Sequence, residues 1–328
     1  MIINFLQKKW KIIIFVFLAF FVGLFIDLPL SQDIACDKFK YKYINPDLVC
    51  DDKTIVSKKS YRELKVKVED FISLETKAGK ITNASIYFRD LQNGPTLGIN
   101  EYEEFSPASL LKLPLFLTYL KLEIDQPEIL STEIGFNNVD KVFNQYYPAK
   151  VYAKENTEYK ISELLNYMIK YSDNNSYYAL HKYLLQNFPD TDLMLQTFKD
   201  LGIIDPKNPT DQTISVKSYS SIFVQLYHNS FFPNRDLSEY ALDMLVDTDF
   251  KEGITQGIPI DIKVAHKFGE RSGFDLGEKQ LHDCGIVYYP ENPYLLCVMT
   301  KGPDFFVLSQ FISKISEMVY EEFDSRKL

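Results

Sequence analysis

In FSPASLLKLPL, residues 105–115, a serine and a lysine stand three residues apart at the start of an apolar run. Residues at i and i+3 of a helix share a face, so the amine of Lys112 can reach the hydroxyl of Ser109. Pro107 suits the first turn of such a helix, whose N-terminus favours negative charge developing at the serine. A serine becomes a nucleophile through a neighbouring base, and apolar surroundings favour the neutral, basic form of a lysine. The sequence therefore predicts an activated serine at a helix start.

Two more short motifs follow this one along the chain. Ser-Asp-Asn occupies residues 172–174, and Lys-Phe-Gly occupies residues 267–269. By itself Ser-Asp-Asn is also a good helix cap and turn. In this order, however, the three motifs resemble the signature of class A β-lactamases and penicillin-binding proteins, whose third motif is Lys-Thr-Gly. The resemblance covers the chain from about residue 64 to the C-terminus.

The resemblance implies an α+β, β-lactamase/transpeptidase-like fold, with an antiparallel sheet flanked by helices and a mostly helical inserted subdomain. The periodicity of the sequence agrees with this plan. It predicts helices over residues 61–78 and 304–322, strands over 84–91, 96–105, 261–268, 281–289 and 294–300, and a mostly helical region over about 107–245.

The resemblance also assigns catalytic roles. Ser109 is the nucleophile that attacks a β-lactam or a peptide carbonyl and forms an acyl-enzyme. Lys112 is the base or part of a proton relay, and Ser172 passes a proton toward the leaving nitrogen. Asp173 is expected to brace its loop from behind rather than to meet substrate.

Four further positions are expected to bind the substrate. Asn174 holds a substrate amide, and Lys267 supplies positive charge and attracts a substrate carboxylate. Gly269 lets the substrate backbone lie close to an edge strand. The main-chain N–H groups of Ser109 and Glu270 form the oxyanion hole, usually the largest electrostatic contribution in such sites.

Two departures from the family pattern bear on function. Phe268 stands where the family has threonine or serine, so a hydroxyl that binds the substrate carboxylate is missing, and Arg271 or Ser272 are the candidates to replace it. The family also has a loop glutamate that activates the deacylating water, but residues 203–212 contain no glutamate, and their carboxylates are Asp205 and Asp211. No deacylating base is therefore assigned.

The leading prediction is a serine hydrolase that acts on β-lactams or as a D-Ala-D-Ala peptidase through a Ser109 acyl-enzyme. Its substrate would be a small-molecule β-lactam or a peptidoglycan D-Ala-D-Ala peptide. The alternative is a non-hydrolysing penicillin-binding, cell-wall-peptide-binding or sensor module. The missing glutamate and Phe268 favour the alternative, and the intact Ser109–Lys112 and Ser172–Asn174 pairs favour the enzyme.

The N-terminus predicts a membrane segment. Residues 12–26 are apolar and uncharged, and lysines precede them, so the rest of the chain is expected outside the cytoplasm, at the cell surface or in the periplasm. We expect a membrane anchor or signal segment at residues 1–30, a polar extracytoplasmic stalk at 31–60 and the hydrolase domain at 61–328. Cleavage with secretion, or lipidation at Cys36, are the other possibilities.

Composition narrows the partners. The 328 residues carry a net charge of −9 without a basic run beyond the first dozen residues, which argues against nucleic acid. No cofactor is implied, and no Cys–His spacing suggests a metal site. Cys36 and Cys50 could close a small loop. Cys284 and Cys297 should lie across a hairpin from each other, either as a disulfide or as two buried thiols.

Overall fold

The computed structural model describes residues 41–46, 61–92, 94, 96–136, 145–203, 213–272 and 277–325. The chain divides into two compact units, Met1–Lys40 and Tyr41–Leu328, and every described residue belongs to the second. The expected membrane segment at residues 12–26, together with Cys36 and Cys50, lies outside the described residues. Within the described ranges, no helix is both long and apolar enough to cross a membrane.

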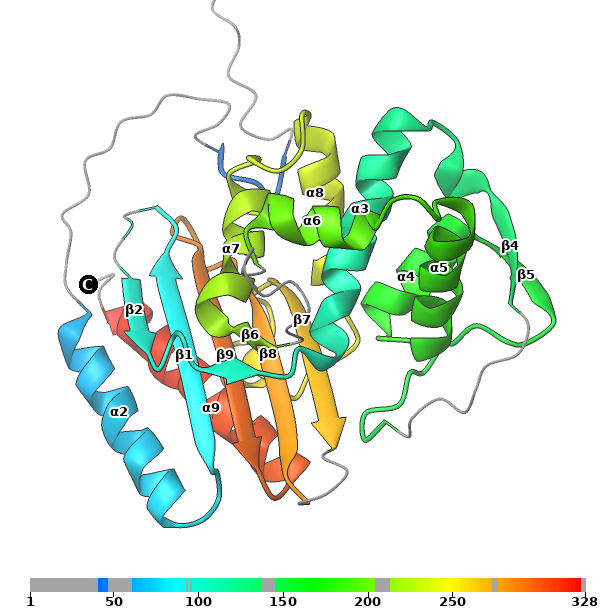
Figure 1. The fold of residues 1–328 in the computed structure, drawn as a ribbon. Helices are drawn as coiled ribbons and strands as arrows, with labels where there is room; N and C mark the ends of the chain where they lie inside the picture. The colour runs from blue at the N-terminus through cyan, green and yellow to red at the C-terminus, as the bar shows by residue number, and fades with distance from the viewer. Residues whose placement is uncertain are drawn as a thin grey trace, which may run out of the picture. The chain divides into compact units, whose positions relative to one another are not determined.

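The centre of the second unit is a sheet of five antiparallel strands in the order β2–β1–β9–β8–β7, as Figure 1 shows. The bounds are Asn83–Asp90 for β1, Thr96–Ile99 for β2, Val264–Ser272 for β7, Lys279–Val287 for β8 and Tyr294–Gly302 for β9. The predicted antiparallel sheet is thus confirmed. β7 is an edge strand, so one side of its backbone is not paired within this sheet.

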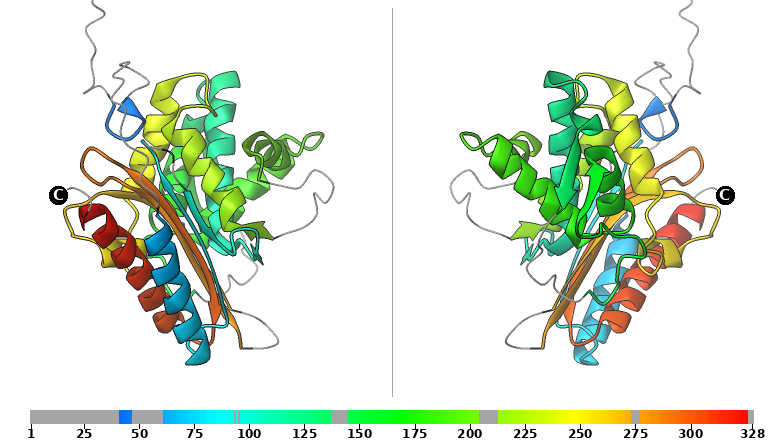
Figure 2. Two further views of the ribbon diagram at one scale, coloured as in Figure 1. Left: turned by 90° about the vertical axis from the view of Figure 1, so that its left-hand side faces the viewer. Right: turned by 90° about the vertical axis from the view of Figure 1, so that its right-hand side faces the viewer.

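Helices cover both faces of this sheet (Figure 2). On one face lie α2, Arg62–Lys77, and α9, Phe305–Ser325, close to the helices predicted there. On the other lie α7, Val216–Tyr227, and α8, Arg235–Val246. Covering on both faces explains why almost every residue of β9 is buried and why its sequence is a continuous apolar run rather than an alternating one.

The mostly helical region is confirmed, with additions that the sequence did not predict. Its helices include α3, Lys112–Asp125, α4, Ile161–Lys170, α5, Asn174–Asn187, and α6, Leu193–Leu201. Short 3₁₀ turns in this region are η2, Ala108–Leu111, and η3, Ile129–Ser131, and a third, η4, Ile254–Gly257, follows the region. A small antiparallel pair, β4, Glu133–Phe136, and β5, Thr157–Lys160, lies inside this region. Four-residue strands carry too little alternation to be recognised from sequence.

Two predicted strands were wrong in their bounds. The strand expected over residues 96–105 ends at Ile99, because Asn100 takes a left-handed φ of 49° and turns the chain. Beyond the turn, β3, Glu104–Phe105, pairs with β6, Ile214–Ser215. The strand expected over residues 261–268 is β7, which starts at residue 264 and runs to 272, so the third motif lies in mid-strand.

A disulfide joins Cys284 of β8 to Cys297 of β9. The two residues are direct partners in the β8–β9 register, as the sequence predicted. Of the two possibilities left open, disulfide or buried thiols, the structure has the disulfide.

Residues 41–46, which fall within the stalk expected at 31–60, lie against α7 and α8. The main-chain N–H groups of Lys42, Tyr43 and Ile44 all donate to the carboxylate of Glu239 in α8. The side chain of Ile44 is buried in the core. Together with hydrogen bonds from Asn45 to the carbonyl oxygen of Tyr227 and from Tyr288 to the carbonyl oxygen of Tyr43, this carboxylate holds residues 41–46 on the helices and sheet of the unit.

Candidate active site

The nucleophile candidate, Ser109, lies in η2, which runs directly into α3. Ala108 has a left-handed φ of 49°, unusual for a residue other than glycine and a local strain that sets the direction in which the next residue enters the turn. Residues 112–120 of α3 are all buried, so the turn continues into a tightly packed helix. Ser109 is thus presented from a rigid, strained helix start.

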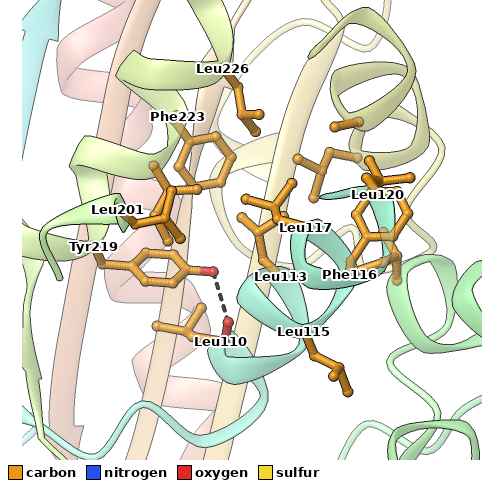
Figure 3. Close-up of a cluster of buried hydrophobic side chains, with 14 of the residues drawn as sticks. Leu110, Leu113, Leu115, Phe116, Leu117, Leu120, Leu201, Tyr219, Phe223 and Leu226 are labelled. Carbon is orange, nitrogen blue, oxygen red and sulfur yellow. Dashed lines mark hydrogen bonds between the residues drawn. The ribbon is translucent and has the colours of Figure 1, made fainter. Parts of the chain in front are cut away.

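Tyr219 of α7 forms a hydrogen bond with this turn. Its buried hydroxyl donates to the carbonyl oxygen of Leu110 at 3.1 Å. Figure 3 shows this bond inside an apolar cluster in which Leu113 and Leu117 of α3 face Phe223 of α7. The carbonyl next to the nucleophile is therefore satisfied within the core instead of by water.

His282 of β8 fixes the residues that lead into the turn. One ring nitrogen, Nε2, lies 3.0 Å from the carbonyl oxygen of Ser106, and the other, Nδ1, accepts from the N–H of Thr300 at 3.3 Å. Because Nδ1 accepts, Nε2 must carry the proton and donate. Burial lowers the pKa of His282 to about 4, so the ring is neutral and acts as a structural brace.

The amine of Lys112 is the centre of the site. Its Nζ lies 2.9 Å from Ser109 Oγ, 3.1 Å from Ser172 Oγ, 2.5 Å from the carbonyl oxygen of Ser172 and 2.7 Å from Asn174 Oδ1. The last two atoms can only accept hydrogen bonds, and a neutral amine has two N–H groups to give them. Its lone pair then faces a serine hydroxyl, which is the arrangement that a general base needs.

The environment of Lys112 favours this neutral form. Burial lowers the pKa of its amine from 10.5 to about 7, against the opposing charges of Asp173 and Glu270. A pKa near neutrality is suited to removing a proton from Ser109 under physiological conditions.

The Ser-Asp-Asn turn carries the next two groups. Ser172 has a left-handed φ of 56° and aims both its carbonyl and its hydroxyl at Lys112. Asp173 is the N-cap of α5: its carboxylate accepts from the N–H groups of Asn175, Ser176 and Ala153. As predicted, Asp173 braces the turn and its oxygens are used within the protein.

Lys267 reaches the same hydroxyl from β7. Its Nζ lies 2.9 Å from Ser172 Oγ and 3.0 Å from the carbonyl oxygen of Phe268. Burial, and then repulsion by Lys112, hold the pKa of Lys267 well below its usual range. The two amines are linked through one hydroxyl, so a proton arriving at Lys112 has a hydrogen-bonded path to Ser172.

Gly269 packs closely against the nucleophile turn. A Cβ atom at this position would lie 3.0 Å from the carbonyl oxygen of Pro107 and 3.1 Å from the main-chain nitrogen of Leu110. The absence of a side chain at this position lets β7 lie against η2. This packing places the main chain of β7 beside that of the nucleophile turn. The expected approach of a substrate backbone to Gly269 stays a prediction, as does the oxyanion-hole pairing of Ser109 and Glu270.

The side chain of Glu270 was missed by sequence reasoning. Its carboxylate accepts from the main-chain N–H groups of Tyr146 at 2.9 Å and Tyr147 at 3.0 Å. Next to them, Gln145 donates to the carbonyl oxygen of Ser172 at 3.3 Å. Residues 145–147 therefore connect the Ser-Asp-Asn turn to β7. The partners are over 120 residues apart in the chain, and the sequence carries no signal that pairs them.

The structure thus brings Ser109, Lys112, Ser172, Asn174 and Lys267 into one hydrogen-bond network, with Gly269 and Glu270 beside it. Asp205 and Asp211 lie outside the described residues. In the part of the chain that is described, no carboxylate hydrogen-bonds to Ser109, Lys112 or Ser172. The described residues also contain no group of three His, Cys, Asp or Glu side chains placed to hold a metal ion.

We compared the structure with solved structures of other proteins. Solved structures that share the fold include an acyl-enzyme complex of a PBP-A point mutant with penicillin G, with a TM-score of 0.65 at 21% identity, over 83% of this chain and 100% of that one. The TLA-3 extended-spectrum β-lactamase gives 0.68 at 19% identity, over 80% of this chain and 99% of its own. A class A β-lactamase from Mycobacterium abscessus gives 0.62 at 19% identity, over 78% and 99%. These likenesses show the fold.

A search of curated protein sequences finds no match. The sequence profile named Beta-lactamase2 matches residues 63–323. This range includes the five-stranded sheet, the helices on both of its faces and all three motifs. The chain belongs to the Beta-lactamase enzyme family.

Proposed function

We propose that this chain is an acyl-transferring serine hydrolase that opens a β-lactam or cleaves a D-Ala-D-Ala type peptide through an acyl-enzyme on Ser109. The observation that carries the proposal is the Lys112 amine, which lies 2.9 Å from Ser109 Oγ and has a pKa of about 7. That pairing gives a serine the base that it needs to act as a nucleophile.

In the proposed reaction the residues of this hydrogen-bond network transfer one proton in successive steps. Neutral Lys112 takes the proton of Ser109 as its oxygen bonds to the carbonyl carbon, and the N–H groups of Ser109 and Glu270 receive the oxyanion. The proton then passes from Lys112 through Ser172 to the departing nitrogen as the C–N bond breaks. Asn174, whose Oδ1 is engaged by Lys112, offers its Nδ2 to the substrate carbonyl.

No residue is assigned as the base that would activate water to hydrolyse the acyl-enzyme, which is the second half of the reaction. Among the described residues, no carboxylate hydrogen-bonds to Ser109, Lys112 or Ser172, and a positioned general base is worth about 10²–10⁴ in rate. This favours a second candidate function, a penicillin-binding or sensor module that is acylated and stays acylated.

The proposal includes an extracytoplasmic location, with residues 12–26 as the membrane anchor. Support comes from the lysines that precede this apolar run and from the Cys284–Cys297 disulfide, because disulfides persist in oxidising compartments. Labelling of the N- and C-terminal ends in intact and permeabilised cells tests this placement. A C-terminus that is reached only after the cytoplasmic membrane itself is permeabilised contradicts it.

The decisive experiment is the intact mass of the full-length protein over time after mixing with benzylpenicillin, with Ser109→Ala beside it. A Ser109-dependent adduct that persists for hours supports the acylated module. Drug that disappears with only a brief Ser109-dependent adduct supports a hydrolase. The absence of any adduct and of any drug loss contradicts both for this ligand class.

A further inference from the structure

The side chains of β7 point alternately to the two faces of the sheet. Lys267 and Gly269 lie on the nucleophile side, since Lys267 bonds to Ser172 and Gly269 packs on η2. Phe268 belongs to the apolar core on the side that α9 covers, and Glu270 follows it on that side. Contacts made to alternate residues of this strand therefore report on opposite sides of the sheet.

Residues 145–147, here named the edge crossing, reach from one side of the sheet to the other. The side-chain amide of Gln145 donates to the carbonyl oxygen of Ser172, on the nucleophile side, at 3.3 Å. Two residues later, the ring of Tyr147 packs against the core on the α9 side, with its centroid 6.0 Å from that of Phe268. One edge of β7 is paired with β8 along the whole strand, so this short segment passes around the other, free edge.

Glu270 fastens the edge crossing to β7. One oxygen of its carboxylate accepts from the N–H of Tyr146 at 2.9 Å, and the other accepts from the N–H of Tyr147 at 3.0 Å. Among the described residues, no lysine, arginine or histidine forms an ion pair with Glu270. Hydrogen bonds to an ionised acceptor are stronger than those between neutral groups, so this carboxylate is an effective anchor.

Aromatic contacts hold the edge crossing at the surface of the protein. The ring of Tyr146 lies 5.0 Å from that of Phe305, at the start of α9, and the ring of Tyr147 lies 5.0 Å from that of Phe250. Tyr146 is nevertheless 52% exposed. A surface segment held by few contacts can open locally while the sheet stays folded.

The edge crossing limits what can lie along β7. An extended chain can add to a free strand edge through main-chain hydrogen bonds. Beside residues 267–269 it has a length of about 10 Å at the rise of a β-strand before it meets the crossing at Glu270. A chain that continues further requires the edge crossing to open.

Resting on the proposed function, we propose that the edge crossing is a latch fastened by Glu270, which admits short acyl donors to Ser109 and excludes extended ones. Ser109 is partly exposed, so a donor that ends beside residues 267–269 does not need the latch to open. A donor that runs past Gly269 must first break two hydrogen bonds to a charged carboxylate. The selection is then one of size, and it is lost when the latch is released.

Three penicillins with the same ring system test this size limit: benzylpenicillin, a penicillin whose 6-amino group carries a long peptide chain, and benzylpenicillin extended at its carboxyl group by a peptide amide. Acylation of the full-length protein is followed by intact mass for the wild type, Glu270→Ala and Gln145→Ala. Glu321→Ala, on the exposed side of α9, is the matched control.

The wild type and Glu321→Ala should react at least about tenfold more slowly with one of the two extended compounds than with benzylpenicillin, which corresponds to about 1.4 kcal/mol. Glu270→Ala and Gln145→Ala should lose most of that difference, because each removes one attachment of the edge crossing. The ratio of rates within one variant is compared, so a general change in reactivity does not affect the result.

Hydrogen exchange tests the latch without any substrate. In Glu270→Ala the main-chain amides of Tyr146 and Tyr147 should exchange at least about tenfold faster than in the wild type, because they lose the carboxylate that holds them. The amide of Ala153, which Asp173 holds, should be unchanged and serves as the internal control.

Equal reactivity of the wild type toward the three penicillins, or a difference that neither latch variant changes, overturns the size limit and leaves the proposed function standing. Unchanged exchange at Tyr146 and Tyr147 in Glu270→Ala overturns the latch itself. If none of the three compounds acylates Ser109, the proposed function fails, and the size limit fails with it.

Discussion

The amines of Lys112 and Lys267 meet on a single atom, the hydroxyl oxygen of Ser172, at 3.1 and 2.9 Å. Two buried ammonium groups so close together would repel strongly, so burial and mutual repulsion together favour a state in which at least one amine is neutral. The Ser172 hydroxyl therefore provides a path for a proton between the two amines, and no histidine is assigned a part in it.

The first prediction concerns the pH dependence of acylation. The pKa of Lys112 is lowered to about 7, and the base is the deprotonated form. The acylation rate should therefore rise with pH through about 7 and level off above it, and at pH 5 it should be roughly a hundredfold below the plateau. Stopped-flow or quenched mass measurements between pH 5 and 9 give the profile. Lys112→Arg, which keeps its charge throughout, should be inactive at every pH, and a flat wild-type profile would rule out Lys112 as the base.

The second prediction separates function from strain at Ser172. Both Ser172→Ala and Ser172→Gly remove the hydroxyl, so both should lower the acylation rate by about 10²-fold or more. The left-handed φ of 56° costs alanine but not glycine. Ser172→Gly should therefore exceed Ser172→Ala in free energy of unfolding by about 1 kcal/mol. Denaturant titration measures that difference, and equal stabilities would show that the turn is unstrained.

The third prediction tests the approach of β7 to the nucleophile turn. Gly269→Ala places a Cβ against Pro107 and Leu110, and should cost about 1–3 kcal/mol of stability and slow acylation by moving Ser109. Gly135→Ala in β4 is the control, because nothing lies within 4 Å of a Cβ there. A Gly269→Ala protein as stable and as reactive as Gly135→Ala would contradict the close packing.

The fourth prediction concerns the disulfide. Cys284 and Cys297 are separated by 13 residues, and a cross-link of a loop of that size typically contributes about 2–4 kcal/mol. Denaturant unfolding should therefore shift to lower denaturant on addition of dithiothreitol. The double variant Cys284→Ala/Cys297→Ala should show no further shift with reductant; a shift there would locate the sensitivity elsewhere.

The convergence of Ser109, Lys112 and Ser172 was predictable because each belongs to a short local motif with a fixed order in the chain. Helical spacing brought the first two together, and the resemblance supplied the third. The identity of the helices and central strands was also predictable, since long amphipathic or continuously apolar segments leave clear periodic signals.

The contacts made by single side chains across the fold were not predictable. The bond from Tyr146 to Glu270 joins a segment in the helical region to an edge strand, and no periodicity encodes it. The reason for Gly269 depends on the distance between β7 and η2, which only the packed structure fixes. The small β4–β5 pair is too short to leave a pattern.

The pairing of β1 with β9 has a consequence for the order in which the molecule is built. The first long strand of the sheet, Asn83–Asp90, pairs with Tyr294–Gly302, which is synthesised after all the other described strands. Such non-local pairing waits for loop closure over the whole intervening sequence. A growing polypeptide can thus form the helices that carry Ser109 and Ser172 well before β7 and Lys267 have a sheet to join. Reactivity should consequently appear only once translation has reached the C-terminal strands, so that incomplete chains carry the nucleophile without the means to use it.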